Sequence, residues 1–176
     1  MKEYEKNWRT LRDFDRGRIP AAVLDWILDS HSLTQRVRAF CGDTPFRVRV
    51  LSLRYRPAST AESCVLKIKP GLSVLDRQVQ LCCDERPLVY ARSLLPVTLF
   101  TGRQQRLKFQ GSKSLGATLF SDPSVTRGEL QVASVAAGNI PGAEPAEQAV
   151  WGRRSVFRIQ GKPLLVAEFY LPHLFQ

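Results

Sequence analysis

The chain has 176 residues, 44% of them hydrophobic and 24% charged, and a formal net charge of +10 at pH 7. This length and composition fit one soluble globular domain with a sizeable core. No apolar run approaches the roughly 20 residues of a membrane-spanning helix and the N-terminal segment 1–18 is polar, so we expect a cytoplasmic protein without stable membrane insertion.

The basic residues are dispersed along the chain and form no block of Lys or Arg. Nucleic-acid modules usually gather such residues on one face or in one motif. We therefore expect no nucleic-acid partner and interpret the charge as a basic surface that attracts small anions.

The first predicted elements are helices. Residues 19–41 carry apolar side chains at helical spacing in two pieces, and Pro20 suits the start of the first piece. Ser32, followed three residues later by Gln35, is a capping-box pattern that begins the second piece.

From Phe46 the apolar period changes to two, which predicts strands of an antiparallel sheet. We interpret residues 56–72 as a loop or irregular edge, because Pro, Ser and Gly are frequent there. Strands over residues 75–83 and 88–95 are joined by a tight turn, and a short helix is predicted over residues 115–120.

The last third of the chain predicts a strand over residues 130–134 and a final hairpin formed by residues 155–159 and 163–171. Between them, residues 135–150 are rich in Ala, Gly and Pro and are interpreted as an inserted surface loop. Sequential hairpins with helices at the start and middle predict an α+β fold with an antiparallel sheet, in one domain over residues 1–176.

One carboxylate stands out in this pattern. Residues 163–171 are apolar on both faces of a strand except for Glu168, and a buried carboxylate needs a positive partner or a proton. Alternation makes Arg77 a lone cation in an apolar row and gives Arg92 apolar neighbours on the next strand. A buried Arg77–Glu168 ion pair and a lined pocket both remain open from this pattern.

Other residues carry little chemistry on pattern alone. We interpret Arg153 and Arg154, beside Trp151, as a solvated turn with one arginine stacked on the indole. Leu33 and Leu115 are interpreted as core leucines.

The four cysteines, at positions 41, 64, 82 and 83, are interpreted as reduced core residues. No C-x-x-C occurs and only His31 and His173 are present, so metal sites and histidine acid–base chemistry have few candidates. Nucleotide-binding glycine motifs and a serine nucleophile elbow are also missing from the sequence.

Several motifs, in order over residues 20–172, resemble the bacterial chorismate pyruvate-lyases of ubiquinone biosynthesis. The specific ones lie near the end of the chain: WGRRS at 151–155, GKPLL at 161–165 and EFYLP at 168–172. Supporting segments are LDWIL at 24–28, SLTQR at 32–36, ARSLLP at 91–96 and Thr126-Arg127.

The resemblance implies a six-stranded antiparallel sheet with helices, and helical flaps that cover an internal ligand site. It implies conversion of chorismate to 4-hydroxybenzoate and pyruvate, with no cofactor and no metal. It also implies a monomer whose only partner is its small-molecule substrate, and strong inhibition by the product.

Site residues follow from the resemblance position by position. Arg77 would hold the ring carboxylate in a bidentate pair, and Glu168 would face the opposite end of the ring, near the C4 oxygen. We expect both to be catalytic, with Glu168 either positioning the substrate or donating a proton. Leu33 and Leu115 would contact the ligand from the flaps, and Arg92 would contribute electrostatically from further away.

A second function remains open, a non-catalytic sensor domain that binds small aromatic carboxylates. The effector-binding domains of some bacterial transcription regulators resemble this lyase fold, and a shared fold does not decide function. The presence of both Arg77 and Glu168 favours the enzyme.

Overall fold

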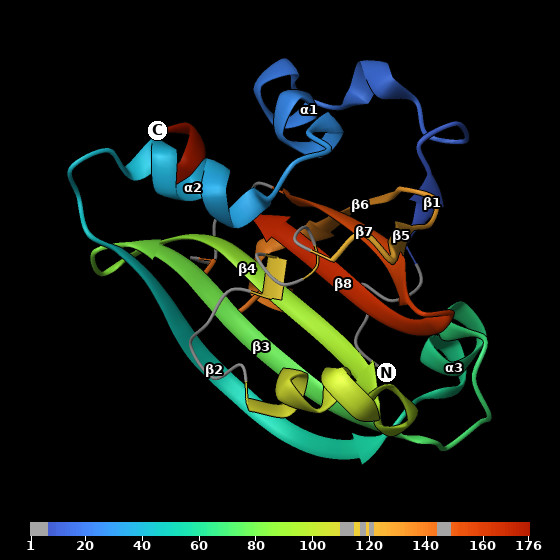
Figure 1. The fold of residues 1–176 in the computed structure, drawn as a ribbon. Coiled ribbons are helices and arrows are strands. Elements are labelled where there is room, and N and C mark those ends of the chain that lie inside the picture. The colour runs from blue at the N-terminus through green and yellow to red at the C-terminus, as the bar shows by residue number, and fades with distance from the viewer. Residues whose placement is uncertain (1–6, 110–114, 117–118, 120–121, 144–148) are drawn as a thin grey trace.

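The computed structural model describes residues 7–109, 115–116, 119, 122–143 and 149–176 (Figure 1). In this part of the chain an antiparallel sheet of eight strands has the order β1-β6-β7-β8-β4-β3-β2, with β5 paired to β7. The strands are β1 (Arg9–Thr10), β2 (Phe46–Pro57), β3 (Ser73–Cys83), β4 (Arg86–Pro96), β5 (Val125–Arg127), β6 (Gln131–Ala136), β7 (Ala149–Ile159) and β8 (Lys162–Tyr170).

The fold is α+β as predicted, but the six strands implied by the resemblance are corrected to eight among the described residues. Two of the eight are very short: β1 has two residues and pairs with β6, and β5 has three and pairs with β7. Segments this short carry no alternation that a sequence pattern could reveal.

Three α-helices accompany the sheet: α1 (Ala21–Leu28), α2 (Leu33–Cys41) and α3 (Thr60–Leu66). Short 3₁₀ helices span Arg16–Arg18, Val97–Leu99, Gly102–Phe109, Ala137–Asn139 and Pro172–Phe175. No helix in the described part of the chain is long and apolar enough to cross a membrane.

The two N-terminal helices begin where the sequence predicts. Pro20 directly precedes α1, and the Ser32 side chain accepts a hydrogen bond from the Gln35 N–H at the start of α2. Of the predicted helix over residues 115–120, Leu115, Gly116 and Leu119 are helical, and the other residues lie outside the described part.

The loop predicted over residues 56–72 is confirmed for residues 58–59 and 67–72, but the rest of the segment is strand and helix. Strand β2 continues to Pro57, and α3 follows with both halves of a capping box between Ser59 and Glu62. Each side chain accepts a hydrogen bond from a backbone N–H at the start of the helix. The Ser-x-x-Glu spacing is therefore a helix signal, although the Pro and Ser content of the segment favours a loop.

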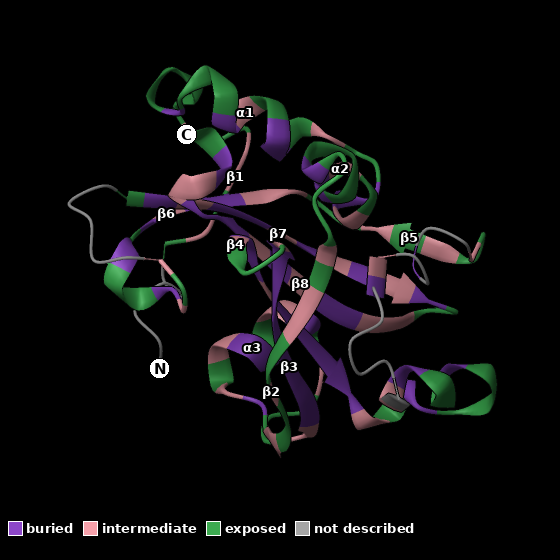
Figure 2. Cartoon of the chain, turned by 90° about the vertical axis from the view of Figure 1, so that its left-hand side faces the viewer, coloured by how far each residue is buried: buried purple, intermediate pink, exposed green. Residues whose placement is uncertain are grey.

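The two faces of the sheet are covered by different elements. Figure 1 shows α1 and α2 lying along one side of the strands, which we call the cavity face, and α3 standing apart near the start of β8. The central strands β3 and β4 are buried along nearly their whole length, because both of their faces are covered (Figure 2). We call the second face, against which α3 packs, the outer face.

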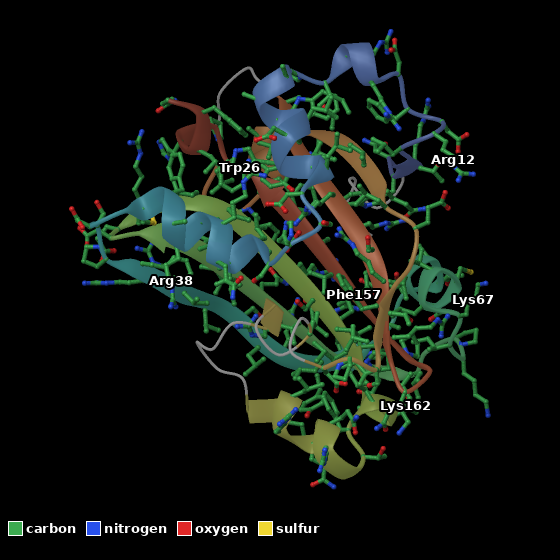
Figure 3. All side chains as sticks on the ribbon, turned by 45° about the horizontal axis from the view of Figure 1, so that its top comes forward. Arg12, Trp26, Arg38, Lys67, Phe157 and Lys162 are labelled. Atoms are coloured by element: carbon green, nitrogen blue, oxygen red, sulfur yellow. A yellow bond between two sulfur atoms is a disulfide. The ribbon has the colours of Figure 1, made fainter. Side chains whose placement is uncertain are left out.

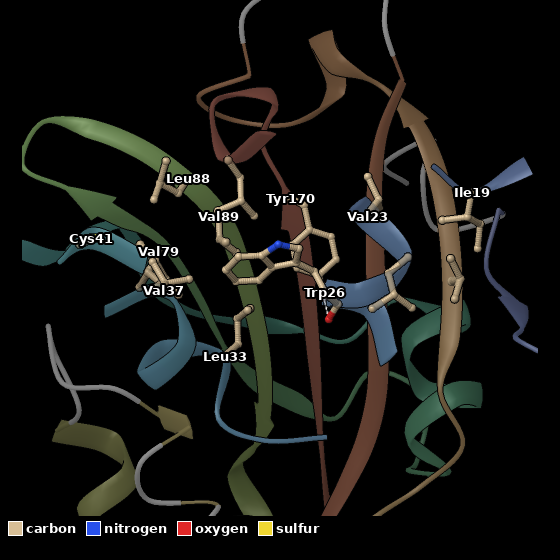
Figure 4. Close-up of a cluster of buried hydrophobic side chains, with 14 residues drawn as sticks. Ile19, Val23, Trp26, Leu33, Val37, Cys41, Val79, Leu88, Val89 and Tyr170 are labelled. Atoms are coloured by element: carbon tan, nitrogen blue, oxygen red, sulfur yellow. Dashed lines mark hydrogen bonds between the residues drawn. The ribbon is translucent and has the colours of Figure 1, made fainter. Parts of the chain in front are cut away.

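Side chains of α1 and α2 pack against the cavity face around Trp26 and Tyr170 (Figure 4). The Tyr170 hydroxyl donates to the Trp26 carbonyl at 3.0 Å, and the two rings lie 6.3 Å apart. Val37 of α2 and Val79 of β3 belong to the same cluster. These contacts fix both helices over the carboxyl end of β8, where Glu168 lies.

A disulfide joins Cys41, the last residue of α2, to Cys83 at the end of β3. The prediction of four reduced core cysteines is therefore wrong for this pair, and Cys64 is exposed rather than buried. Cys82 is a buried free cysteine, as predicted. The Cα atoms of the bonded pair lie 5.5 Å apart because α2 crosses directly over the β2–β3 edge, a tertiary contact with no local sequence signal.

The segment predicted as an inserted surface loop, residues 135–150, packs on the outer face where it is described. Ala137 and Ile140 are each only 2% exposed, and the Pro141 carbonyl accepts a hydrogen bond from Gln80. Residues 144–148 lie outside the described part.

Candidate active-site cavity

The cavity face holds a partly open pocket beneath α2. Its empty volume, which includes solvent space at the mouth, is about 600 Å³. All four predicted site residues line it, and they come from four parts of the chain: Leu33, Arg77, Leu115 and Glu168. Leu33 lies at the start of α2 and points toward the sheet (Figure 4).

Strand register places Arg77 in one row across the cavity floor. Arg77 on β3 is opposite Ser93 on β4, Ser93 is opposite Val166 on β8, and Val166 is opposite Ser155 on β7. The middle of this row therefore consists of two short side chains, Ser93 and Val166. Such a floor leaves room above it for a flat ligand.

Arg77 is 4% exposed, so its guanidinium is removed from water. Burial lowers the pKa of Arg77 to about 10, which means that the protein interior disfavours its charge. A carboxylate ligand in the cavity would relieve this penalty by forming a charge-assisted pair.

Glu168 lies in the neighbouring row, with Val79, Ala91 and Arg153. Its carboxylate accepts a hydrogen bond from the Arg153 Nε at 2.7 Å. The ion pair of Glu168 is therefore formed with Arg153, and the alternative pairing of Arg77 with Glu168 is not the one adopted.

The interpretation of Arg153 as part of a solvated turn is wrong, because its side chain is only 2% exposed. Its Nη1 donates to the carbonyl oxygens of Trp26 and Ile27, each at 3.1 Å, and to that of Asp29. Burial opposes its charge, but Glu168, Tyr170 and Asp29 together outweigh burial and raise the pKa of Arg153. Arg153 thus links Glu168 to the carboxyl end of α1.

The hairpin turn at Gln160–Gly161 could have revealed this pairing from the sequence. Both residues have positive φ, 50° and 79°, as a tight two-residue turn requires. Counting back from such a turn sets Arg153 opposite Glu168. Gly152 keeps the hairpin close, because a Cβ there would lie 2.5 Å from the ring of Phe169.

The second arginine of the motif, Arg154, points to the outer face. Its guanidinium lies 4.7 Å from the centre of the Trp8 ring, so the stacking partner is Trp8 and not Trp151. The Nε of Arg154 donates to Gln131 at 2.7 Å.

Arg127, at the end of β5, also lines the cavity, a position that no sequence pattern predicted. Its Nε donates to the Ser155 Oγ at 3.1 Å, and its guanidinium lies 5.5 Å from the ring of Phe157, which is labelled in Figure 3. Burial, and then the nearby charge of Arg153, lowers the pKa of Arg127.

Arg92 lies on the outer face and does not line the cavity, which corrects its expected electrostatic role. Its Nη2 donates to Glu62 and to Asp76, each at 2.9 Å. Arg56 binds the same two carboxylates, at 2.6 Å to Glu62 and 2.8 Å to Asp76. We call these four residues the outer-face network.

The carboxylates of this network are strongly favoured in their ionised form. Burial raises the pKa of both groups, but hydrogen bonds and charges from Arg56 and Arg92 outweigh burial. The net result is a pKa of about 2 for Glu62 and about 2 for Asp76.

Among the described residues, the charged side chains that line the cavity are three arginines and one glutamate, which together carry a charge of +2. Three short or apolar positions, Ala91, Ser93 and Val166, separate the arginines of β3 and β5 across the floor. The cavity is therefore suited to a flat ligand with two negative charges.

Known proteins with similar sequences were found over most of the chain. The "Probable chorismate pyruvate-lyase" of Azoarcus sp. (strain BH72) is 41% identical over 157 residues, which cover 84% of this chain and 82% of that protein. The "Chorismate pyruvate-lyase" of Erwinia tasmaniensis is 34% identical over 157 residues, 88% of this chain and 80% of that protein.

Among solved structures, the effector domain of PhnF from Mycobacterium smegmatis has a similar fold. Its TM-score is 0.61 at 17% identity, with 83% of this chain and 91% of that domain covered. An identity this low relates the folds and not the functions. Residues 5–176 match the chorismate lyase family, and the chain belongs to this family.

Proposed function

We propose that this protein is a chorismate pyruvate-lyase, which converts chorismate to 4-hydroxybenzoate and pyruvate. The observation that carries the proposal is one cavity that holds Arg77 and Glu168 on the same sheet face in adjacent rows, with a net positive charge around them. Family membership supports the same reaction.

Arg77 anchors the ring carboxylate of the substrate. A guanidinium presents a rigid pair of N–H donors that match a carboxylate, and its burial excludes competing water. Because burial disfavours the charge of Arg77, an anion bound beside this side chain is held more strongly.

Glu168 faces the C4 end of the ring and orients it. A carboxylate is an acceptor only, so Glu168 can accept a hydrogen bond from the C4 hydroxyl while Arg153 holds its other side. We therefore favour a positioning role for Glu168 over the donation of a proton.

The chemistry itself is a balanced elimination. The C3–O bond of chorismate breaks, the ring loses a proton from C4 and becomes aromatic, and the released enolpyruvate takes up a proton to give pyruvate. No electrons enter or leave, so no redox partner is consumed. The cavity accelerates the step by holding the reactive conformer and stabilising charge that develops on the ether oxygen.

Leu33 and Leu115 close the apolar part of the cavity over the ring. Leu33 is 3% exposed and Leu115 is 6% exposed, so both are well placed to exclude water from a bound ligand. A ligand enclosed in this way leaves slowly, and we expect 4-hydroxybenzoate to be a strong inhibitor of turnover. The cavity is built from one chain, and we expect a monomer to be active.

Incubation of the purified protein with chorismate, without added metal or cofactor, tests the proposal. We expect equal amounts of 4-hydroxybenzoate, measured by chromatography, and of pyruvate, measured with a coupled lactate dehydrogenase assay. A protein that binds 4-hydroxybenzoate tightly but releases no pyruvate would contradict the proposal and favour the sensor function, which the fold shared with the PhnF effector domain makes the second candidate.

A further inference from the structure

We propose that Arg127 binds the second carboxylate of the substrate, the one on the enolpyruvyl group, and thereby makes the cavity selective for a dianion. This inference rests on the proposed function. Arg77 anchors the ring and Arg153 pairs with Glu168, whereas Arg127 has no role so far in the proposed reaction.

The geometry of Arg127 presents its outer donors to the cavity. Only its Nε is used within the described residues, as the donor to Ser155 Oγ at 3.1 Å. The flat guanidinium lies 5.5 Å from the ring of Phe157, which restricts its orientation. The four N–H bonds on Nη1 and Nη2 make no hydrogen bond to the part of the chain that the structure describes.

The other two cavity arginines have different tasks. Arg153 donates hydrogen bonds to Glu168 and to the carbonyl oxygens at the end of α1, so its charge neutralises that of the cavity carboxylate Glu168. Arg77 lies across the floor, where the ring carboxylate is anchored. One positive charge remains for one further carboxylate, and Arg127 carries it.

The spacing between the two anchors suits a substrate with a carboxylate on either side of a ring. Arg77 and Ser155, the partner of Arg127, lie in one row on β3 and β7, with β4 and β8 between them. Three interstrand steps of about 4.8 Å separate their backbones by roughly 14 Å. Long arginine side chains reaching inward from both ends leave the ring above Ser93 and Val166.

Arg127 also lies where charge develops during the reaction. When the C3–O bond breaks, its electron pair goes to the ether oxygen, and the leaving enolpyruvate carries this charge in addition to its carboxylate. The C4 proton lost by the ring is matched by the proton that enolpyruvate gains as it becomes pyruvate. A guanidinium beside the leaving group stabilises the transition state more than the ground state.

The test compares substrate with product on the same variants, because 4-hydroxybenzoate has only the ring carboxylate. For Arg127→Met we expect kcat/KM with chorismate to fall roughly 10- to 100-fold, as for loss of a charged hydrogen bond. The inhibition constant of 4-hydroxybenzoate should change less than about twofold, since the product does not reach Arg127. Arg127→Lys keeps the positive charge but not the planar pair of guanidinium donors. We therefore expect its kcat/KM with chorismate to lie between those of Arg127→Met and wild type.

Arg158→Met is the matched control. Arg158 is opposite Thr126 in the same strand pair, its side chain donates to the Gly161 carbonyl, and it does not line the cavity. This variant removes the same charge from the same pair of strands, so both kinetic constants should stay within about twofold of wild type.

Equal losses of substrate and product affinity in Arg127→Met would overturn the inference, since they would indicate a general electrostatic or structural effect. An unchanged kcat/KM in Arg127→Met would overturn it as well. If Arg127→Met fails to fold, the same comparison with Arg127→Lys decides. Failure of the proposed function is recognised separately, because wild-type protein would then release no pyruvate at all.

Discussion

The two faces of the central sheet carry the same kinds of charged side chain in different proportions. Within the outer-face network two arginines meet two carboxylates, and every member binds two others. Arg154, on the same face, contacts Gln131 and Trp8 and is not part of the network. In the part of the cavity lining that the structure describes, three arginines meet one carboxylate. In a balanced network every charge is paired within the protein, and the network serves the stability and specificity of the fold. An excess of positive charge instead suits the binding of a negatively charged ligand.

Adjacent residues on one strand show how closely the two environments lie. Asp76 and Arg77 follow each other on β3, and alternation sends Asp76 to the outer face and Arg77 to the cavity. The hydrogen bonds that Arg56 donates to Glu62 raise the pKa of Arg56 in the outer-face network, whereas burial lowers the pKa of Arg77. Carboxylates therefore stabilise the charge of the partly buried Arg56 on the outer face, whereas burial disfavours the charge of Arg77 in the cavity.

The largest effect is expected on activity from Arg77→Met. Loss of the ring-carboxylate anchor should lower kcat/KM with chorismate by roughly 1000-fold, at the upper end of what one preorganised donor group contributes. The melting temperature should fall less than in Arg92→Met, because burial disfavours the charge of Arg77. Steady-state kinetics and thermal unfolding measure both, with Arg158→Met as the control. Near-normal turnover, or a large loss of stability, would contradict the view that the cavity charges serve ligand binding and the outer-face charges serve stability.

The reverse outcome is expected from Arg92→Met in the outer-face network. Removing one arginine leaves Glu62 and Asp76 partly uncompensated, and breaking a buried network of this kind costs about 3–5 kcal/mol of unfolding free energy. The fraction that stays folded should keep kcat/KM within about twofold of wild type, because Arg92 does not line the cavity. Denaturant unfolding and kinetics well below the melting temperature test this. A stable variant with impaired turnover would show that the outer face also takes part in catalysis.

Local patterns were enough to predict most elements that form the two faces. Ser32 and Gln35 marked the start of α2, and alternation put Arg77 and Glu168 among apolar neighbours. Each of these signals is contained in fewer than ten neighbouring residues, so no tertiary information was needed.

The remaining features depend on contacts between distant segments. The partner of Glu168 follows from hairpin register, and the disulfide between Cys41 and Cys83 follows from where α2 crosses the sheet. Arg127 reaches the cavity only because the three-residue β5 pairs with β7. Neither composition nor periodicity contains this information, since the residues that meet are far apart in the chain.

A smaller effect on activity is expected from Arg153→Lys, which tests the link between the cavity and α1. Lysine keeps a charge near Glu168 but cannot donate at the same time to the carboxylate and to the carbonyls of Trp26 and Ile27. We expect kcat to fall about 10- to 30-fold with KM changed less than threefold, since Glu168 is misplaced in the transition state. A rise in KM with unchanged kcat would assign Arg153 to substrate binding instead of positioning.

The smallest effect is the acid sensitivity of the outer-face network. Glu62 and Asp76 have a pKa of about 2 in the folded protein, against about 4 in an unfolded chain. Because folding lowers both pKa values, their stabilisation is complete above about pH 5 and is lost as the pH falls toward 2. At pH 3.5 the two groups together should cost about 2 kcal/mol of unfolding free energy relative to pH 7. Arg77→Met should retain this loss, because the cavity arginine does not titrate in acid.

Asp76→Asn separates this contribution from that of the other carboxylates. Although the variant is less stable at pH 7, its unfolding free energy should decline less between pH 5 and 3.5 than that of wild type, by about 1 kcal/mol. Chemical denaturation at matched ionic strength gives both slopes. If the slopes of wild type and Asp76→Asn coincide, the carboxylate is not held ionised by Arg56 and Arg92, and the charge balance assigned to the outer face is wrong. A flatter dependence of unfolding free energy on pH in Asp76→Asn, with an unchanged dependence in Arg77→Met, would assign the acid response to the outer-face network. The excess positive charge of the cavity would then act in ligand binding and not in acid stability.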